Sequence, residues 1–479
     1  MATPIPPNQA TFTLSEVARA TGAVLSGSDG KVIRGIATDS RADLTGKLFV
    51  ALCGDRFDGH EYLQQAVACG AAAVLVERDD IPEIPIPVLR VPSTLRALGD
   101  IAQRHRQNWP GRVIAVVGSA GKTTTRVAIE TVLSAIVEQR VHATRGNLNN
   151  LVGVPMTLLG LTEQHEIAVI EVGTNARGEV ARLSGLCMPQ IAVLTLIGLE
   201  HTEGLSDLDG VEREEGRVFA ALAGDGMAIG NGDDQRVMNQ LSQIHDPNRR
   251  LTYGCQRSAD YCATHRVAES LDQTSISIRR SDRFGGGQVS LGTRLLGLPG
   301  AMAVTAAVAV AETLGLEIDP SRVNAALMRT DLGEAGRLKA AVLSDGTVVL
   351  DDSYNANPPS MLSSIALAND LAQRRPGRLI LVLGEMLELG QHSEREHTIL
   401  GTKLGQVAQL IAVGAQAEAL SRSARACGKK TAFVPDARQA AELLLSLVRD
   451  GDVVLVKGSR SVHLEIVVES LMAQKGYAA

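Results

Sequence analysis

The residues best suited to chemistry lie in one short stretch, residues 114–125, with the sequence Ile-Ala-Val-Val-Gly-Ser-Ala-Gly-Lys-Thr-Thr-Thr. An apolar run, typical of a buried strand, leads into a glycine turn and the start of a helix. Glycines let backbone N–H groups approach phosphate oxygens, the helix start favours an anion, and the lysine adds a positive charge. The stretch predicts a phosphate-binding loop for a nucleotide, made of Gly118, Ser119, Ala120, Gly121, Lys122, Thr123 and Thr124.

The spacing of this loop, G-x-x-G-K-T, is shorter than the common G-x-x-x-x-G-K-[ST] pattern, because Val116 stands where that pattern has its first glycine. The alternative is an ordinary strand-to-helix turn with a surface lysine. Two glycines, Lys122 and the hydroxyl of Thr123 in the right order favour the nucleotide, and Thr123 would offer its hydroxyl to Mg²⁺.

An acid and a histidine follow two later apolar runs. Glu171 lies near the end of residues 167–172, where an isolated carboxylate is costly unless it is paired or bound to a cation. Glu171 is therefore a candidate Mg²⁺ ligand. His201 follows the predicted strand 191–196 and stands beside several acids, which favours a functional role over that of an ordinary surface histidine.

Three asparagines and a glycine in residues 144–150 predict a turn. The simplest interpretation is a turn and nothing more. Because this turn directly follows the helix of the phosphate loop, Asn147 and Asn150 are also candidate catalytic residues.

Composition favours an enzyme that acts on small molecules. The chain has 479 residues, enough for about three domains, with a formal net charge of −6 and a pI near 6.0. That charge argues against a nucleic-acid surface. The six cysteines lack metal-ligand spacing, which predicts reduced thiols and a cytoplasmic location. No signal sequence and no apolar run of 18 residues occur, so we expect no membrane span.

The pattern of apolar and polar residues predicts an α/β protein throughout. Short strands alternate with helices over residues 12–106, and Trp-Pro-Gly at 109–111 suggests a boundary. Residues 247–295 look like irregular β structure, and residues 330–336 suggest a second boundary. Strands and helices alternate again to the end, which predicts a parallel, doubly wound sheet. The predicted domains are 1–108, 109–331 and 332–479.

The chain resembles the Mur ligases, the ATP-dependent amide-forming enzymes of peptidoglycan precursor synthesis, and within them the MurF type that adds D-alanyl-D-alanine. The short phosphate loop is the loop of that family. The resemblance runs almost from end to end, and its most specific motifs lie at residues 146–150 with 153–156, 351–358, 384–390 and 456–461.

The resemblance implies a fold of three domains: an N-terminal domain for the UDP-sugar, a central P-loop ATPase domain, and a mobile, Rossmann-like C-terminal domain. It implies ATP and Mg²⁺, and as substrates UDP-N-acetylmuramoyl-tripeptide and D-alanyl-D-alanine. A substrate carboxylate would attack the γ-phosphate to form an acyl phosphate, which the dipeptide amine would displace. We expect a monomer.

The resemblance also assigns residues to roles. Asp39, Ser40 and Arg41 would contact the UDP-sugar, and Arg337 and Asp352 would reach ATP from the third domain. The closed cleft would be lined by substrate-binding side chains of the third domain: Asn355, Asn357, Lys457, Ser459 and Arg460. Lys122, Asn147, Asn150 and His201 would be catalytic.

The chain departs from the family in two places. After residues 298–300, where the family usually has His-Asn and a further Asn, this chain has Met302, Ala303 and Ala306, so the nucleotide base cannot be held in the usual way. Mur ligases also commonly carry a carbamylated lysine in the helix after the histidine, whose carboxylate helps to bind a second Mg²⁺. Aligned on residues 210–211 and 218–219, this chain has Glu215 there.

No lysine occurs between residues 123 and 338 that could replace the missing one. We expect Glu215 and His201 to serve the second metal without carbamylation. The alternative is that Glu215 is a solvated helix residue.

Two other functions stay open at this stage. One is a related ligase with a different amine acceptor, from another Mur step or a specialised pathway. The other is a P-loop switch or transport ATPase that makes no ligation product.

Overall fold

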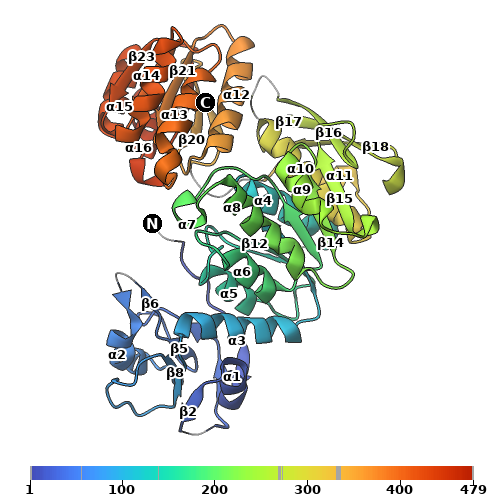
Figure 1. Cartoon of the computed structure of the whole chain (residues 1–479), viewed down its shortest axis with the longest axis vertical. Coiled ribbons are helices and arrows are strands. Elements are labelled where there is room, and N and C mark those ends of the chain that lie inside the picture. Colours follow the sequence, from blue (N-terminus) through green and yellow to red (C-terminus); the bar gives the residue numbers. More distant parts are fainter. Residues whose placement is uncertain are drawn as a thin grey trace.

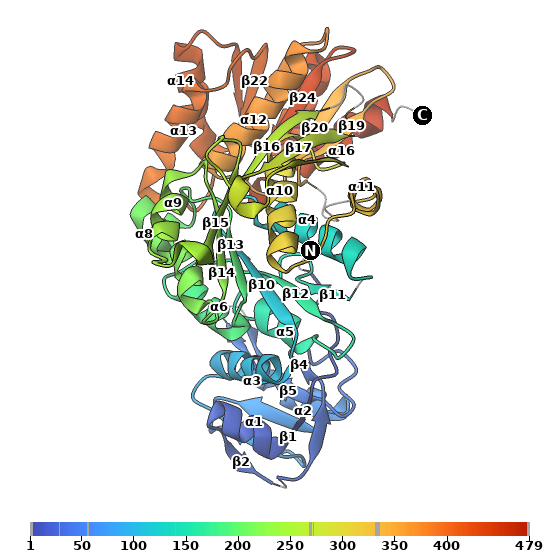
Figure 2. The ribbon, with the colours of Figure 1, turned by 90° about the vertical axis from the view of Figure 1, so that its right-hand side faces the viewer.

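The computed structural model describes residues 3–476 except 28, 55–56, 139, 268–270, 272 and 331–335. Its three main sheets follow one another along the long axis of the molecule (Figures 1 and 2). The chain therefore has the three-part α/β architecture that the resemblance implies. The predicted boundary at 331–332 lies outside the described residues, and the boundary at 108 stays a prediction.

The N-terminal sheet has five strands in the order β2-β9-β8-β5-β4, parallel except for β2. Its strands are β2 (Val24–Ser26), β4 (Ile36–Ala37), β5 (Leu48–Val50), β8 (Ala73–Val76) and β9 (Val88–Arg90). Two small antiparallel pairs accompany it: β1 (Thr11–Thr13) with β3 (Val32–Arg34), and β6 (Cys53–Gly54) with β7 (Phe57–Asp58). The helices are α1 (Leu14–Thr21), α2 (Leu63–Ala68) and α3 (Thr94–Asn108).

The central sheet has nine strands in the order β11-β12-β10-β13-β14-β15-β16-β17-β18. The first seven strands in this order run parallel, and β16, β17 and β18 pair antiparallel, so residues 247–295 are more regular than the sequence suggested. The strands are β10 (Arg112–Val117), β11 (Val141–Ala143), β12 (Ile167–Glu171), β13 (Ile191–Leu194), β14 (Met227–Asn231), β15 (Arg250–Gly254), β16 (Tyr261–Val267), β17 (Thr274–Arg280) and β18 (Gln288–Thr293).

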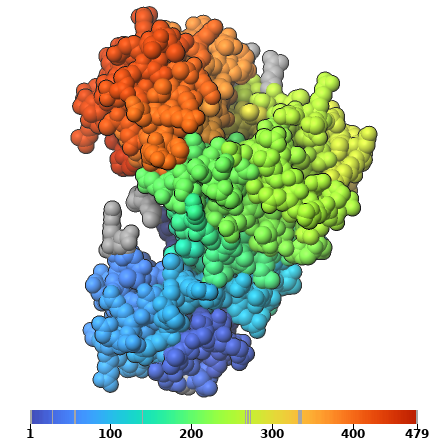
Figure 3. All heavy atoms as spheres, viewed as in Figure 1, coloured from blue at the N-terminus to red at the C-terminus, as the bar shows by residue number. Residues whose placement is uncertain are grey.

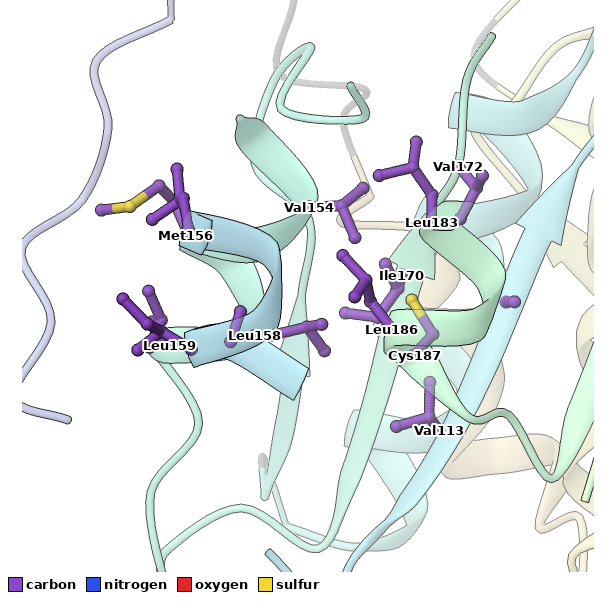
Figure 4. Packing of buried hydrophobic residues seen from close by; sticks show 14 of the residues in the cluster. Val113, Val154, Met156, Leu158, Leu159, Ile170, Val172, Leu183, Leu186 and Cys187 are labelled. Carbon is purple, nitrogen blue, oxygen red and sulfur yellow. The ribbon is translucent and has the colours of Figure 1, made fainter. Parts of the chain in front are cut away.

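Helices cover both faces of the central sheet because alternate residues of its strands point to opposite sides. Ile114 and Val116 of β10 share a core with α4, α10 and α11, whereas Val113 and Ala115 share the opposite core with α3, α5 and α6 (Figure 4). The helices are α4 (Lys122–Ile136), α5 (Gly153–Leu159), α6 (Glu179–Cys187), α7 (Thr202–Leu205), α8 (Leu208–Glu215), α9 (Gln235–Ser242), α10 (Gly297–Thr313) and α11 (Pro320–Leu327).

The C-terminal sheet has six strands in the order β19-β20-β24-β21-β22-β23, and only its edge strand β19 is antiparallel. This confirms the parallel, doubly wound sheet. The strands are β19 (Lys339–Val342), β20 (Val348–Asp352), β21 (Leu379–Gly384), β22 (Gln409–Val413), β23 (Thr431–Val434) and β24 (Val453–Lys457). The helices are α12 (Pro358–Gln373), α13 (Ser393–Thr402), α14 (Glu418–Ala426), α15 (Ala437–Leu447) and α16 (Glu465–Lys475).

Helix α3 joins the N-terminal sheet to the central sheet. It packs against α1 on one side and against α5 and α6 on the other, so one apolar core runs through both parts. Near its end, the buried Arg106 donates hydrogen bonds to the carbonyl oxygens of Cys187 and Trp109, each at 2.9 Å, and to Gln190 Oε1 at 3.3 Å. This arginine therefore ties the end of α3 to the loop between α6 and β13.

No helix in the described part of the chain has the length and apolar character needed to cross a bilayer. All six cysteines are free thiols, as their spacing predicted.

We expect Arg106→Met to lower the free energy of unfolding by about 1.5–3 kcal/mol, because the charged hydrogen bonds are lost and buried carbonyls are left without a donor. The matched control is Arg104→Met in the same helix, where the side chain is exposed and the change should stay within about 0.5 kcal/mol. Denaturant unfolding measures both. Equal stability of the two variants would contradict this role of Arg106.

Candidate active site

The predicted phosphate loop connects β10 to α4 and has the backbone that its glycines permit. Gly118 has a φ of +131°, and a Cβ there would lie 2.2 Å from Thr195 Oγ1 and 2.9 Å from the Leu196 carbonyl oxygen. Only glycine fits this approach to the end of β13. Gly121 has a φ of +81° and directly precedes α4, so the helix start faces the loop.

A cavity of about 690 Å³ opens over this loop. It is lined by residues 119–125 of the loop and α4, by the asparagine turn, and by side chains of the C-terminal sheet. The predicted site residues among its lining are Ser119, Ala120, Gly121, Lys122, Thr123, Thr124, Asn147, Asn150, Glu171, His201, Arg337, Asp352, Asn355, Asn357 and Lys457. Sequence segments more than 200 residues apart thus meet at one cavity.

Lys122 lies at the centre of a group of acids. Its Nζ donates to the Gly118 carbonyl oxygen and lies 3.8 Å from Glu200 Oε1. Burial lowers the pKa of Lys122, but Glu200, Glu215 and Glu171 outweigh burial and hold that pKa above its ordinary value. The ammonium group is therefore charged and available to an anion placed over the loop.

Glu171 ends β12 and is only 2% exposed. Its Oε1 accepts hydrogen bonds from Thr123 Oγ1 at 3.2 Å and from Asn149 Nδ2 at 2.9 Å. Its Oε2 lies 3.4 Å from Arg126 Nε, in an ion pair without a hydrogen bond. Asn149 was not among the predicted site residues, although it belongs to the same asparagine-rich turn.

Glu215 is fully buried at the end of α8, so the alternative of a solvated helix residue is wrong. Neither of its carboxylate oxygens has a hydrogen-bond partner of good geometry among the described residues, and the same holds for Glu200 Oε1. Burial raises the pKa of Glu215 well above its ordinary value; Lys122 and the nearby backbone N–H of Gly118 oppose this rise, and Glu200 adds to it.

His201 has a left-handed backbone, with a φ of 48°, between β13 and α7. Its Nε2 lies 3.9 Å from Glu200 Oε2, and its Nδ1 is paired with Glu388. Burial lowers the pKa of His201, but the hydrogen bond to Glu388 and the charge of Glu200 raise it above its ordinary value. Glu388, in the 384–390 motif, was not among the predicted site residues.

The described residues contain no preassembled group of three or more His, Cys, Asp or Glu side chains at metal-binding spacing. The buried carboxylate oxygens without donors, on Glu171, Glu200 and Glu215, are nevertheless the hard ligands that a divalent cation takes. The chemistry of these groups therefore fits Mg²⁺, and the metal roles stay a prediction.

The C-terminal part contributes a cation from strand β24 and an amide from the start of helix α12. Lys457, 2% exposed, lies 2.6 Å from Asp352 Oδ2 and donates to the Asn355 carbonyl oxygen at 2.8 Å. Asn357 caps the start of α12 and donates from Nδ2 to the carbonyl oxygen of Ser119 in the phosphate loop at 2.9 Å. The loop is thus bonded to the C-terminal part of the molecule.

Some predicted residues lie away from the cavity lining. Asp39 and Arg41 form an exposed ion pair at 2.8 Å beside the N-terminal sheet, where Ser40 is buried and bonded to Gln65. Ser459 accepts the Leu387 N–H at 2.9 Å. Arg460 lies 5.6 Å from the centre of the Tyr354 ring, over which Arg337 also lies at 4.0 Å.

The three residues of the first departure from the family pattern lie on α10, yet only one of them reaches the cavity. Met302 lines it, together with Tyr253, Leu298 and Pro299. Ala303 and Ala306 are 1% and 0% exposed and face the core. The side chains that α10 contributes to the cavity lining are therefore apolar.

We expect Glu215→Gln to stabilise the ligand-free protein by roughly 1–3 kcal/mol near pH 8, the usual cost of an uncompensated buried polar group. Because the folded-state pKa of Glu215 is raised, its contribution to stability is fully present below the ordinary pKa of a glutamate and is lost as the pH rises. The advantage of the variant should therefore shrink towards pH 5. Denaturant unfolding at several pH values measures it, and a variant less stable than the parent at every pH would contradict the burial of an uncompensated charge.

Three family models match the chain in order: "Mur ligase family, catalytic domain" at residues 32–106, "Mur ligase middle domain" at 116–311, and "Mur ligase, glutamate ligase domain" at 336–460. The chain is 35% identical to the UDP-N-acetylmuramoyl-tripeptide--D-alanyl-D-alanine ligase of Escherichia coli, over 96% of this chain and 98% of that protein. It is 34% identical to the enzyme of the same name from Bacillus subtilis, over 92% and 93%.

Solved structures agree with these sequence matches. A MurF crystal structure from Acinetobacter baumannii matches with a TM-score of 0.85 and 29% identity, over 98% of this chain and 100% of that one. The MurF ligase from Thermotoga maritima in complex with ADP matches with a TM-score of 0.78 and 27% identity, over 92% and 97%. From the identity to its relatives, the extent of the matches and the shared architecture, we conclude that the chain belongs to the Mur ligase family.

Proposed function

We infer that this protein is the ATP-dependent ligase that adds D-alanyl-D-alanine to UDP-N-acetylmuramoyl-tripeptide in peptidoglycan precursor synthesis. Relatives of that name match over nearly the full length of the chain. The observation that carries the proposal is the cavity that unites the phosphate loop with side chains of the C-terminal sheet. A phosphoryl donor and an amine acceptor can meet there. We place the enzyme in the cytoplasm, as a monomer.

The reaction needs two displacements. A carboxylate oxygen of the tripeptide attacks the γ-phosphorus of ATP and ADP leaves, which gives an acyl phosphate. The amine nitrogen of the dipeptide then attacks the acyl carbon, phosphate leaves, and the nitrogen loses a proton. Phosphoryl transfer depends on positioning and charge neutralisation, which the loop N–H groups and Lys122 supply. The polar contact between Asn357 and the loop helps to close the cavity, which keeps water away from the acyl phosphate.

Mg²⁺ would neutralise phosphate charge in this site. Thr123 and Glu171 would hold one ion at the loop, and Glu215 with His201 would serve a second. Glu200 lies within 4 Å of both Lys122 and His201, and so it lies between the two proposed ion sites.

The substrates would approach from opposite parts of the molecule. Asp39, Ser40 and Arg41 would contact the UDP-sugar, and Asn355, Lys457, Ser459 and Arg460 would contact substrate from the C-terminal sheet. Arg337 and Asp352 would reach ATP, and Asn147 and Asn150 would act near the reacting carboxylate.

The experiment that tests the function is phosphate release with UDP-N-acetylmuramoyl-tripeptide and ATP, with and without D-alanyl-D-alanine, combined with mass analysis of the product. A ligase makes the pentapeptide product only when the dipeptide is present. A P-loop ATPase without ligase activity would release phosphate regardless of the dipeptide, and a related ligase would require a different amine.

We expect Lys122→Ala to lower kcat/KM for ligation by at least about 100-fold. Lys122 stabilises phosphate charge in the transition state, and loss of this contact should raise the activation free energy by about 3 kcal/mol or more. Lys403→Ala, at an exposed lysine after α13, is the control and should match the parent. Steady-state kinetics and circular dichroism measure activity and folding. A folded Lys122→Ala variant with normal turnover would refute the role of the loop.

We expect Glu171→Gln to raise the Mg²⁺ concentration for half-maximal rate by about 10–100-fold, since the shape is kept and the charge is lost. Glu166→Gln, at a half-exposed glutamate just before β12, is the matched control. The measurements are the Mg²⁺ dependence of the rate and direct Mn²⁺ binding. If the two variants behaved alike, Glu171 would be a structural acid.

A further inference from the structure

The first described residues cross from the N-terminal sheet to the active-site cavity. Asn8 is buried, and its side-chain amide forms two hydrogen bonds with the backbone of Ile36. Its Nδ2 donates to the Ile36 carbonyl oxygen at 2.8 Å, and its Oδ1 accepts the Ile36 N–H at 3.1 Å. At the other end, Thr3 Oγ1 accepts the backbone N–H of Asn147 at 3.3 Å. Both ends of residues 3–8 are therefore attached, each to a different part of the molecule.

The attachment at Thr3 is close. A Cβ on Gly146 would lie 2.2 Å from Thr3 Oγ1 and 2.6 Å from Thr3 Cγ2, so any side chain at residue 146 would collide with Thr3 unless Thr3 moved. Gly146 also has a φ of +51°, in the left-handed region. The turn before Asn147 is thus shaped around the start of the chain.

The segment between the two attachments is stiff. Pro4, Pro6 and Pro7 restrict the backbone to extended conformations, which rise by about 3.1 Å per residue, so residues 3–8 span roughly 15 Å. The side chains from Pro4 to Pro7 are exposed, including Ile5. In Figures 1 and 2 the first described residues run beside the central part, and Figure 3 shows an indentation of the surface between the N-terminal and central parts.

The two attachments coincide with the two ends of the path that the substrate must follow. Asn8 is bonded to β4, which leads within two residues to the Asp39–Arg41 ion pair, and Asn147 lines the cavity over the phosphate loop. On the proposed function, the UDP-sugar lies at the first place and its peptide carboxylate reacts at the second.

We propose that residues 3–8, here called the N-terminal strap, form one wall of the substrate's path, and that Thr3 is a positioning residue for the Asn147 turn. This inference rests on the proposed ligase function. Thr3 acts by holding the backbone N–H of Asn147, so that the turn is ordered before the muramoyl peptide arrives. Ordering a loop in advance lowers the cost of binding the ligand that the loop must meet.

The test compares the full-length parent with Thr3→Val, which keeps the shape and removes the acceptor, and with Thr3→Ser, which keeps the hydroxyl. We expect Thr3→Val to raise the KM for UDP-N-acetylmuramoyl-tripeptide by about three- to tenfold, the effect of one lost hydrogen bond. The KM for ATP should stay within about twofold, and Thr3→Ser should match the parent. A chain without residues 2–7 should show at least the effect of Thr3→Val.

Two controls separate positioning from general damage. Thr11→Val removes a hydroxyl that donates to the nearby Gln9 carbonyl oxygen, away from the Asn147 turn, and it should leave both KM values unchanged. Gly146→Ala should raise the KM more in the full chain than in the truncated one, because the clash with Thr3 exists only in the former. Hydrogen exchange at Asn147, followed by mass spectrometry, should be faster in Thr3→Val and unchanged in Thr3→Ser.

The outcomes distinguish the two proposals. A parent that makes no product with this substrate refutes the proposed function. An active parent that Thr3→Val and the truncation leave unchanged refutes the strap, as does an equal rise in the KM for ATP. A lower KM for the UDP-substrate after truncation would mean that the segment competes with substrate, and it would also overturn the positioning role.

Discussion

The site depends on three buried carboxyl groups gathered around a single lysine. Glu171, Glu200 and Glu215 surround Lys122, and Arg126 pairs with both Glu171 and Glu130. In a low-dielectric interior such a group is unfavourable unless cations complete it. Carboxylate oxygens without hydrogen bonds are the places where a divalent ion would do so. The same carboxyl groups keep the Lys122 ammonium charged for an incoming phosphate. They therefore lower the stability of the ligand-free protein and also prepare the site to bind a phosphate group.

The central sheet brings these charges together. Its strands β10, β12 and β13 are parallel neighbours, with Val116 opposite Glu171 and Val117 opposite Leu194. Their carboxyl ends therefore meet at one edge, which is the usual place for ligands in such sheets. Gly118 allows the loop to bend tightly against Thr195, and any side chain at that position would push the loop away from the edge.

The other two parts of the molecule are attached to this edge in different ways. The N-terminal sheet shares a continuous apolar core with the central sheet through α3, reinforced by Arg106. The C-terminal part also shares an apolar cluster with the central part, through Val267 and Leu296, and it adds polar contacts at the cavity, from Asn357 to the loop and from Glu388 to His201. The cavity thus lies at a boundary where polar contacts near the reacting groups accompany apolar packing.

Local sequence determined the phosphate loop, the parallel C-terminal sheet and the strand that carries Glu171, because these follow from glycine spacing, apolar periodicity and the cost of a buried carboxylate. The family was also recognisable from motifs alone. Only the tertiary structure decided that Glu215 is buried rather than solvated, that Asn149 and Glu388 join the site, and that Thr3 reaches Asn147. Each of these depends on which distant segments meet. The charged residues of α8 could be solvated or buried, and the sequence of the helix does not decide between the two. The proline-rich residues 3–8 have no periodicity that indicates which segment they contact. Burial and long-range contact are properties of the packed chain, which no local pattern encodes.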